Sequence, residues 1–184
     1  MRIIAGSNRG RKLFGPKGLC VRPTSDRVKQ RIFDILPWEL SGFSVLDLFA
    51  GTGSLGMEAL SRGAERAVFV DVSKACAKII ERNAELCGFE HRTRVIHAPV
   101  MKALTHPLLG ECSFHLALVD PPYDQAWGDR TLARLGAAKI FAASAEIVIE
   151  HTSREALLAA YGPFVLRDQR QVGQTWLSFY THSS

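Results

Sequence analysis

The sequence predicts an α/β fold in which a mostly parallel, twisted sheet is covered by helices on both faces. Three observations predict it: short apolar runs alternate with amphipathic segments, glycine-rich turns follow several of the runs, and the last two β-like segments flank a glycine. The chain has 184 residues, of which 47% are hydrophobic, so it can bury one substantial core. We therefore expect one main domain.

An N-terminal extension precedes this domain. Residues 2–5 and 11–14 are β-like and are separated by Gly and Asn, so residues 1–22 are predicted to form a basic hairpin or extended arm. Residues 23–184 form the predicted main domain. It opens with a helix for which Thr24 or Ser25 is the expected N-cap. The apolar residues of one face of this helix are Val28, Ile32, Phe33, Ile35 and Leu36.

The alternating units follow in order. We predict strands at residues 44–49, 67–72, 94–97, 114–119 and 147–150, and helices at residues 54–61, 74–86 and 131–138. Gly63 and Gly88 follow the first two of these helices, where glycine commonly ends a helix. Residues 164–172 and 175–180 flank Gly173 and predict an antiparallel C-terminal hairpin that extends the sheet.

Positive charge is concentrated at the N-terminus. Residues 1–31 contain nine basic residues and one acid, a charge of +8, which leaves −3 for the remainder of a chain whose formal charge is +5. Cations that neutralise phosphates release condensed counterions, so a basic arm favours a polyanionic partner. The alternative is a solvated arm without a partner.

The remaining composition excludes several classes of protein. Cys20, Cys76, Cys87 and Cys112 form no CxxC pair and no cluster with histidine, which indicates reduced structural thiols and no zinc site. No apolar stretch approaches the roughly 20 residues of a membrane span, and the N-terminus lacks a signal-peptide apolar region. We expect a cytoplasmic protein without a membrane partner.

The segment Asp120-Pro121-Pro122-Tyr123 closes the apolar run at residues 114–119. Because proline has no backbone N–H, the strand has to end there, with a carboxylate at its tip and an aromatic ring three positions on. Carboxylate and carbonyl oxygens can accept the protons of an amine, and a ring can stack on a flat base. The segment predicts a site for an amine-bearing base, with a rigid surface turn as the alternative.

A glycine-rich turn follows the first predicted strand, with the sequence Asp47-Leu48-Phe49-Ala50-Gly51-Thr52-Gly53-Ser54-Leu55-Gly56. Glycine lets a ligand approach the backbone where a Cβ would clash. Asp71, at the tip of the second predicted strand, can accept hydrogen bonds from ribose hydroxyls. Doubly wound sheets bind ligands beyond the carboxyl ends of their strands, and both features belong there.

The same glycines also match the dinucleotide pattern G-x-G-x-x-G, with Asp71 about 20 residues further on. Two features argue against this interpretation. Asp47 would repel a pyrophosphate but suits the ammonium group of an amino-acid moiety, and a hydride-transfer enzyme has no use for the motif at Asp120. A third interpretation, in which the glycines serve only packing, leaves Asp47 and Asp71 unexplained.

These residues resemble known motifs. Residues 47–53 look like motif I of class I S-adenosylmethionine (SAM) methyltransferases, and residues 120–123 resemble motif IV of enzymes that methylate amines. Three further stretches resemble the bacterial RsmD family of 16S rRNA guanine-N2 methyltransferases: Met1-Arg2-Ile3-Ile4-Ala5-Gly6 with residues 10–13, residues 22–29 and residues 55–63. The resemblance spans nearly the whole chain and implies a Rossmann-like class I methyltransferase fold with SAM as cofactor.

The resemblance also implies site residues. The expected catalytic residues are Asp120, Pro121, Pro122 and Tyr123. The expected cofactor contacts are Arg22, Thr24, Asp47, Phe49, Ala50, Gly51, Thr52, Gly53, Asp71, Val72, Ser73 and Ala98. The basic residues expected to contact RNA are Arg9, Arg11, Lys12, Arg27 and Lys29. One departure is His97-Ala98-Pro99-Val100, which stands where the family often has an acid near the adenine.

The expected function is methyl transfer from SAM to the exocyclic N2 amine of a specific guanosine in 16S rRNA. A carboxylate can accept guanine N1–H and N2–H together, whereas adenine suits an amide better. The expected partner is 16S rRNA in the small ribosomal subunit or an assembly intermediate, and the protein is expected to act as a monomer. The alternatives are a DNA adenine-N6 methyltransferase, disfavoured by the lack of a target-recognition segment, and a non-catalytic RNA-binding assembly factor, disfavoured by residues 120–123.

Overall fold

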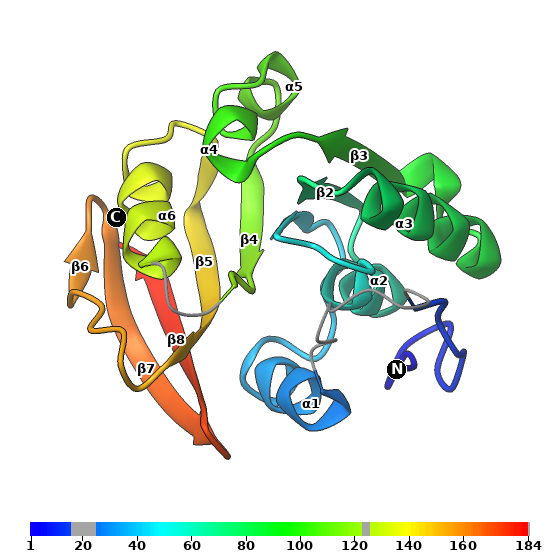
Figure 1. The fold of residues 1–184 in the computed structure, drawn as a ribbon, viewed down its shortest axis with the longest axis horizontal. Helices are drawn as coiled ribbons and strands as arrows, with labels where there is room; N and C mark the ends of the chain where they lie inside the picture. Colours follow the sequence, from blue (N-terminus) through cyan, green and yellow to red (C-terminus); the bar gives the residue numbers. More distant parts are fainter. Residues whose placement is uncertain (16–24, 123–125, 184) are drawn as a thin grey trace.

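The protein is described by a computed structural model, which covers residues 1–15, 25–122 and 126–183. Its centre is an eight-stranded sheet in the order β3-β2-β1-β4-β5-β8-β7-β6 (Figure 1). The parallel strands are β1 (Ser44–Leu48), β2 (Arg66–Asp71), β3 (Thr93–His97), β4 (Phe114–Val119) and β5 (Phe141–Thr152). The antiparallel strands are β6 (Ala160–Tyr161), β7 (Phe164–Val172) and β8 (Thr175–His182).

Helices cover both faces of the sheet. Those of the first face are α1 (Asp26–Ile35), α2 (Ser54–Ser61) and α3 (Lys74–Cys87), and those of the second are α4 (Val100–Ala103), α5 (Pro107–Gly110) and α6 (Trp127–Gly136). Successive strand residues point to opposite faces: Phe69 and Leu118 pack in the first apolar cluster, and Val70 and Val119 in the second. The prediction of a mostly parallel sheet with helices on both faces and an antiparallel C-terminal hairpin is confirmed.

The N-terminal residues Met1–Phe14 form a hairpin that packs on α2. An antiparallel bridge joins Arg2 to Lys12, and the Ile3 side chain is fully buried in the first apolar cluster. At Gly6 the hairpin approaches α2 so closely that a Cβ would lie 1.8 Å from the carbonyl oxygen of Ser61, and φ there is +77°. The hairpin is therefore part of the packed domain.

Several predicted boundaries differ from the observed ones. Ser25, one of the two expected caps, is the N-cap of α1, with its Oγ accepting a hydrogen bond from the Val28 amide at 3.2 Å. The helix predicted at residues 131–138 begins earlier, at Trp127, and the strand predicted at residues 147–150 extends from Phe141 to Thr152. The sequence did not predict α4, α5, β6 or the 3-10 helix Glu90–Arg92. Across the described residues, no helix has the length and apolar character needed to cross a membrane.

Candidate cofactor and catalytic site

The candidate site lies where the carboxyl ends of β1, β2 and β4 meet. These three strands are neighbours and run parallel, so the glycine turn after β1, Asp71 at the end of β2 and Asp120 after β4 share one edge of the sheet. The chain order reverses between β1 and β4, because β2 and β3 lie on one side of β1 and β5 lies beyond β4. Open α/β sheets bind ligands at such a switch point.

The turn after β1 has an unusual backbone. Phe49, Gly51 and Gly53 all have positive φ, at 57°, 55° and 76°. Phe49 is not a glycine, so its conformation is strained and has to be held by its surroundings. The Ala50 amide donates to the Val70 carbonyl at 3.0 Å, which fixes the start of the turn against β2. A Cβ at Gly53 would lie 3.2 Å from both Phe69 and Ile80, so packing also restricts this position.

Asp71 is fixed by two backbone amides. Its Oδ2 accepts from Gly51 N–H at 2.8 Å and its Oδ1 from Ser73 N–H at 2.8 Å. A carboxylate oxygen has two lone-pair sites, so each oxygen keeps capacity for another donor. Val72, Ser73 and Ala98 lie at the same edge, since the Ala98 amide donates to the Asp71 carbonyl at 3.1 Å. The geometry suits a carboxylate that accepts from two adjacent hydroxyl groups.

Asp47 is buried beneath the turn. Its Oδ2 accepts from the Gly56 amide at 2.9 Å. Burial raises the pKa of Asp47 well above its usual value, and the charges of Asp120 and Asp71 raise it further, while the Gly56 hydrogen bond opposes the shift. The parallel pairing of β1 with β2 and with β4 brings Asp47, Asp71 and Asp120 to the same edge of the sheet. Such a site favours a cationic ligand and disfavours a pyrophosphate.

Residues 120–123 follow the end of β4 at the site. The Asp120 amide donates to the Leu48 carbonyl at 3.4 Å, next to the glycine turn. Pro121 is buried and Pro122 is exposed, while the predicted stacking residue Tyr123 lies outside the described residues. Trp127, the first residue of α6, contacts Phe49 edge to face with ring centroids 5.9 Å apart. The glycine turn and the start of α6 are therefore in aromatic contact.

A hollow of about 440 Å³ lies beside the same edge of the sheet. It is lined by Ala126, Asp129, Thr152, Arg154, Glu155 and Ala156. Glu155 holds its wall in place, because Oε1 accepts from the amides of Gly128 at 2.8 Å and Asp129 at 3.2 Å at the start of α6. This hollow could not be predicted from the sequence, since β5 and α6 come together only in the folded sheet.

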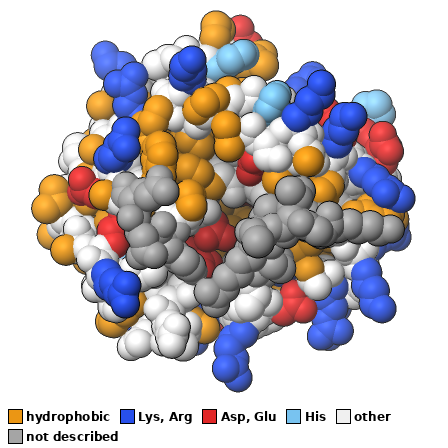
Figure 2. Space-filling model, viewed as in Figure 1, with side chains coloured by type: hydrophobic (Ala, Val, Ile, Leu, Met, Phe, Trp, Pro, Cys, Tyr) orange, Lys and Arg blue, Asp and Glu red, His pale blue; other side chains and the backbone are white. Residues whose placement is uncertain are grey.

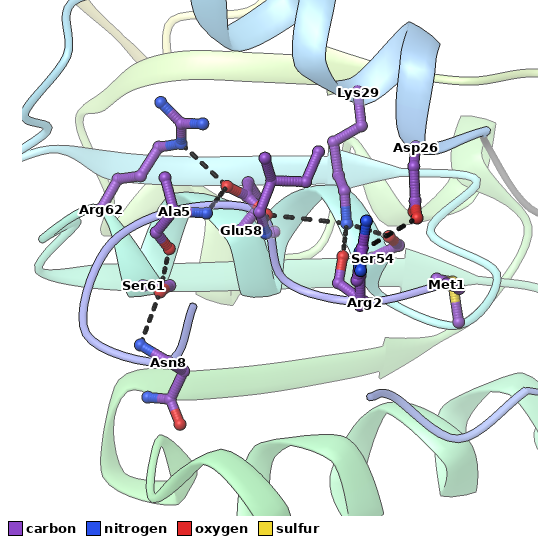
Figure 3. A network of polar contacts seen from close by, with 12 residues as sticks. Met1, Arg2, Ala5, Asn8, Asp26, Lys29, Ser54, Glu58, Ser61 and Arg62 are labelled. Carbon is purple, nitrogen blue, oxygen red and sulfur yellow. Dashed lines mark hydrogen bonds and ion pairs between the residues drawn. The ribbon is translucent and has the colours of Figure 1, made fainter. Parts of the chain in front are cut away.

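The structure contradicts the role predicted for Lys29. It was predicted to contact RNA, but its side chain is fully buried and donates to the Arg2 carbonyl and to Ser54 Oγ at 3.1 Å (Figure 3). Its ammonium also lies 3.6 Å from Glu58 Oε2. Burial lowers the pKa of Lys29, and Glu58 partly opposes that shift. Lys29 thus joins the hairpin to α2 and is not available to phosphate.

The other predicted RNA residues remain accessible. Arg9, Arg11, Lys12 and Arg27 are exposed, although the Arg11 guanidinium donates to the Leu86 carbonyl. Figure 2 shows Lys and Arg side chains spread around the rim of one face, with acidic side chains both at the rim and near the centre. Arg22 and Thr24, predicted to contact the cofactor, lie outside the described residues. Within residues 1–15, 25–122 and 126–183, no group of three His, Cys, Asp or Glu residues could hold a metal ion.

Comparison with known proteins identifies a family for the chain. The model of the family described as conserved hypothetical protein 95 matches residues 1–181. The Escherichia coli (strain K12) protein named ribosomal RNA small subunit methyltransferase D is 30% identical over 180 residues, covering 98% of this chain and 89% of that protein. The Haemophilus influenzae protein of the same name is 38% identical over 125 residues, covering 67% of this chain and 64% of that protein.

Solved structures agree with the sequence comparison. The Escherichia coli protein yhhF, described as a methyltransferase, has a TM-score of 0.86 at 31% identity, covering 100% of this chain and 98% of that chain. A hypothetical protein of Thermus thermophilus has a TM-score of 0.80 at 27% identity, covering 97% of this chain and 98% of that chain. The family match over residues 1–181 and these full-length relatives show that the chain belongs to the conserved hypothetical protein 95 family, the RsmD family that its motifs resemble.

Proposed function

We propose that this protein transfers a methyl group from SAM to the exocyclic N2 amine of a guanosine in 16S rRNA. The observation that carries the proposal is the placement of Asp120 beside the glycine turn, at the edge that also holds Asp71. Relatives named ribosomal RNA small subunit methyltransferase D support rRNA of the small subunit as the substrate. The N2 amine is the finer part of the proposal, and the preference of a carboxylate for guanine supports it.

The acidic residues of the site fit SAM. SAM carries a sulfonium and an ammonium group, and the site contains Asp47, Asp71 and Asp120. We assign the ribose hydroxyls to Asp71, whose oxygens are held by Gly51 and Ser73. We assign the amino-acid portion of SAM to the part of the glycine turn that lies next to Asp47. When bound, SAM supplies an activated methyl group.

The protein's own residues then act on the target amine. The N2 lone pair of guanine is delocalised into the ring, which makes this nitrogen a weak nucleophile. Asp120 and the Pro121 carbonyl accept the N2 protons, which localises the lone pair toward the methyl carbon, and Tyr123 stacks on the base. The N–C bond forms as the S–C bond breaks. The nitrogen then loses one proton to water or to Asp120.

The target base has to leave its stack to reach Asp120. We place the exposed Arg9, Arg11, Lys12 and Arg27 on flanking phosphates, where they give position more than sequence. The proposed substrate is the small subunit or an assembly intermediate, and the protein acts as a cytoplasmic monomer. Sedimentation of the purified protein tests the oligomeric state.

A labelling experiment tests the function. The protein is incubated with methyl-labelled SAM and with small subunits, naked 16S rRNA or duplex DNA. We expect label in the ribosomal substrate only, and nuclease digestion should release it as N2-methylguanosine. Label in DNA alone would support the adenine-N6 methyltransferase, and no label despite RNA binding would support the assembly factor.

Calorimetry tests the cofactor assignment. The parent protein should bind S-adenosylhomocysteine (SAH), the demethylated product, and should not bind NAD. Asp71→Ala removes the acceptor for the ribose and the partner of Gly51 N–H. Because hydrogen bonds to a charged group contribute about 1.5–3 kcal/mol, the variant should bind SAH about 10- to 100-fold more weakly. Parental affinity in this variant would contradict the ribose assignment.

A further inference from the structure

Asn83 connects two parts of the molecule that lie far apart in the sequence. It lies on α3 and is fully buried. Its Nδ2 donates to the Thr52 carbonyl in the glycine turn at 3.0 Å and to the Phe14 carbonyl in the hairpin at 3.2 Å. Its Oδ1 accepts from the Phe14 amide at 2.8 Å. The Phe14 amide needs an acceptor, so the orientation of the Asn83 amide is fixed.

The contact with Thr52 matters because of the turn's composition. Thr52 lies between Gly51 and Gly53, both with positive φ, and glycine has little intrinsic preference for one conformation. The sequence of the turn therefore does not by itself fix its backbone conformation. A hydrogen bond to the Thr52 carbonyl from another element can fix it. The 14-residue helix α3 provides that anchor through Asn83.

We propose that Asn83 is a positioning residue for the cofactor: it holds the turn at residues 49–53 in the conformation that binds SAM. This inference rests on the proposed function, which places SAM at this turn. Without the anchor, only a fraction of the molecules would have the competent turn, and the apparent Kd would rise by the inverse of that fraction.

Only an amide makes all three hydrogen bonds at this position. It offers two donors and one acceptor, and the two carbonyls and the Phe14 amide use all three. The carboxylate introduced by Asn83→Asp would keep the acceptor for Phe14 N–H but would face two carbonyl oxygens without a donor. Asn83→Asp and Asn83→Ala should therefore both release the turn.

Ser61 offers a matched control. It is also buried and also ties the hairpin to a helix, donating to the Ala5 carbonyl at 2.6 Å and accepting from the Asn8 amide at 3.0 Å. Both of these side-chain hydrogen bonds go to the hairpin, and neither goes to the glycine turn. Ser61→Ala thus loosens the hairpin without removing the anchor on Thr52.

The experiment measures SAH affinity by calorimetry and stability by urea unfolding for the parent and for Asn83→Ala, Asn83→Asp and Ser61→Ala. We expect all three variants to be less stable. Only the Asn83 variants should bind SAH about 5- to 50-fold more weakly. In these variants the Thr52 carbonyl loses its hydrogen-bond donor, so the turn is released from the conformation that binds the ligand. Asn83→Ser, which keeps a hydroxyl, is the further variant if the first two do not fold.

Kinetics separate positioning from a general loss of structure. With methyl-accepting RNA saturating, the Asn83 variants should show a raised KM for SAM and a kcat within about twofold of the parent, because saturating SAM selects the competent turn. Parental SAH affinity in folded Asn83 variants, or a lower kcat with unchanged KM, would overturn the inference. A parent protein that binds no SAH would instead refute the proposed function.

Discussion

Asp120 follows β4 directly, and its amide donates to the Leu48 carbonyl next to the glycine turn. In the proposed reaction it accepts amine protons, an interaction that strengthens as the nitrogen attacks. Asp120→Ala should therefore lower the single-turnover methylation rate about 10²- to 10³-fold, the loss typical of one electrostatic contact in the transition state. The SAH Kd should stay within about twofold of the parent.

The measurement uses both substrates at saturating concentration, so that binding does not limit the rate. Asp34→Asn is a suitable control, since Asp34 is an exposed carboxylate whose described partner is Gln30 on the same helix. A parental single-turnover rate in Asp120→Ala would mean that residues 120–123 are only a rigid turn.

Asp47 gives a prediction about pH. Its pKa is raised in the folded protein, so the folded state binds more protons than the unfolded state above the ordinary value of 3.8. Stability from this group is therefore present at low pH and is lost as pH rises from about 4 through the raised pKa, by about 1.4 kcal/mol per pKa unit. Asp47→Asn should remove this loss and unfold at higher urea than the parent at pH 7.

The same substitution should weaken SAH binding about tenfold, because an amide does not attract the ligand's ammonium group as a carboxylate does. Urea unfolding at several pH values from about 4 to 8, each with and without SAH, measures both effects. If the difference between variant and parent does not change with pH, Asp47 is not the titrating group.

Single residues also show what the sequence could predict. Asp47, Asp71 and Asp120 could be predicted because each lies in, ends or follows an apolar run, so parallel strands bring them to one edge. Lys29 could not, since its burial depends on Glu58 in another helix. Asn83 and Glu155 have no local signal at all, because the partners of Asn83 lie 31 and 69 residues away and those of Glu155 lie 26 and 27 residues away.

Among the elements, the hairpin and α2 are joined by Glu58. Its carboxylate accepts from the amides of Ile4 at 2.7 Å and Ala5 at 3.0 Å and from Arg62 Nε at 2.9 Å, beside the Lys29 ammonium (Figure 3). Glu58→Gln would leave two buried cations without a counter-ion. We expect it to lower the free energy of unfolding by about 3–5 kcal/mol.

Urea unfolding measures this loss, and hydrogen exchange at the Ile4 and Ala5 amides shows whether the hairpin separates. Asp168→Asn is the matched control: its partner Arg170 is 48% exposed, so this pair contributes about 1 kcal/mol or less. Equal effects of the two substitutions would show that the buried network does not hold the hairpin.

Element prediction succeeded where the local pattern was strong. The strand at residues 114–119 and the helix at residues 54–61 have the predicted bounds, because an apolar run defines the first and glycines flank the second. The helices α4 and α5 have four residues each, too few to show a helical period. The early part of β5 was missed because Ala142, Ala143 and Ser144 lack strand propensity. These residues lie in an irregular stretch between Phe141 and Glu146, the residues at which β5 pairs with β4.

The unequal distribution of charge along the chain predicts how RNA affinity depends on salt. Replacing Arg9, Arg11 and Lys12 together by Ala should weaken RNA binding and reduce the slope of log K against log salt by about 2, at about 0.7 per lost contact with single-stranded RNA. Binding of SAH should not change, since these side chains are exposed and the hydrogen bond of the Arg11 side chain goes to the Leu86 carbonyl, outside residues 47–53.

Filter binding at several salt concentrations provides the slope. Replacing Lys139, Arg167 and Arg170 by Ala gives a control with the same loss of charge from exposed positions on the opposite half of the sheet. An equal loss of slope in both triple variants would mean that net charge, rather than the hairpin, determines RNA affinity.

The position of β8 has a consequence for synthesis of the protein. This strand follows β5 and β7 in the chain, yet it lies between them in the sheet and pairs with both. While the ribosome is still translating residues 175–182, the apolar strand β5 has an open edge, which is a site for aggregation. The sheet can therefore be completed only after these residues have been made, so a chain that ends just before Thr175 lacks the strand that joins β5 to β7.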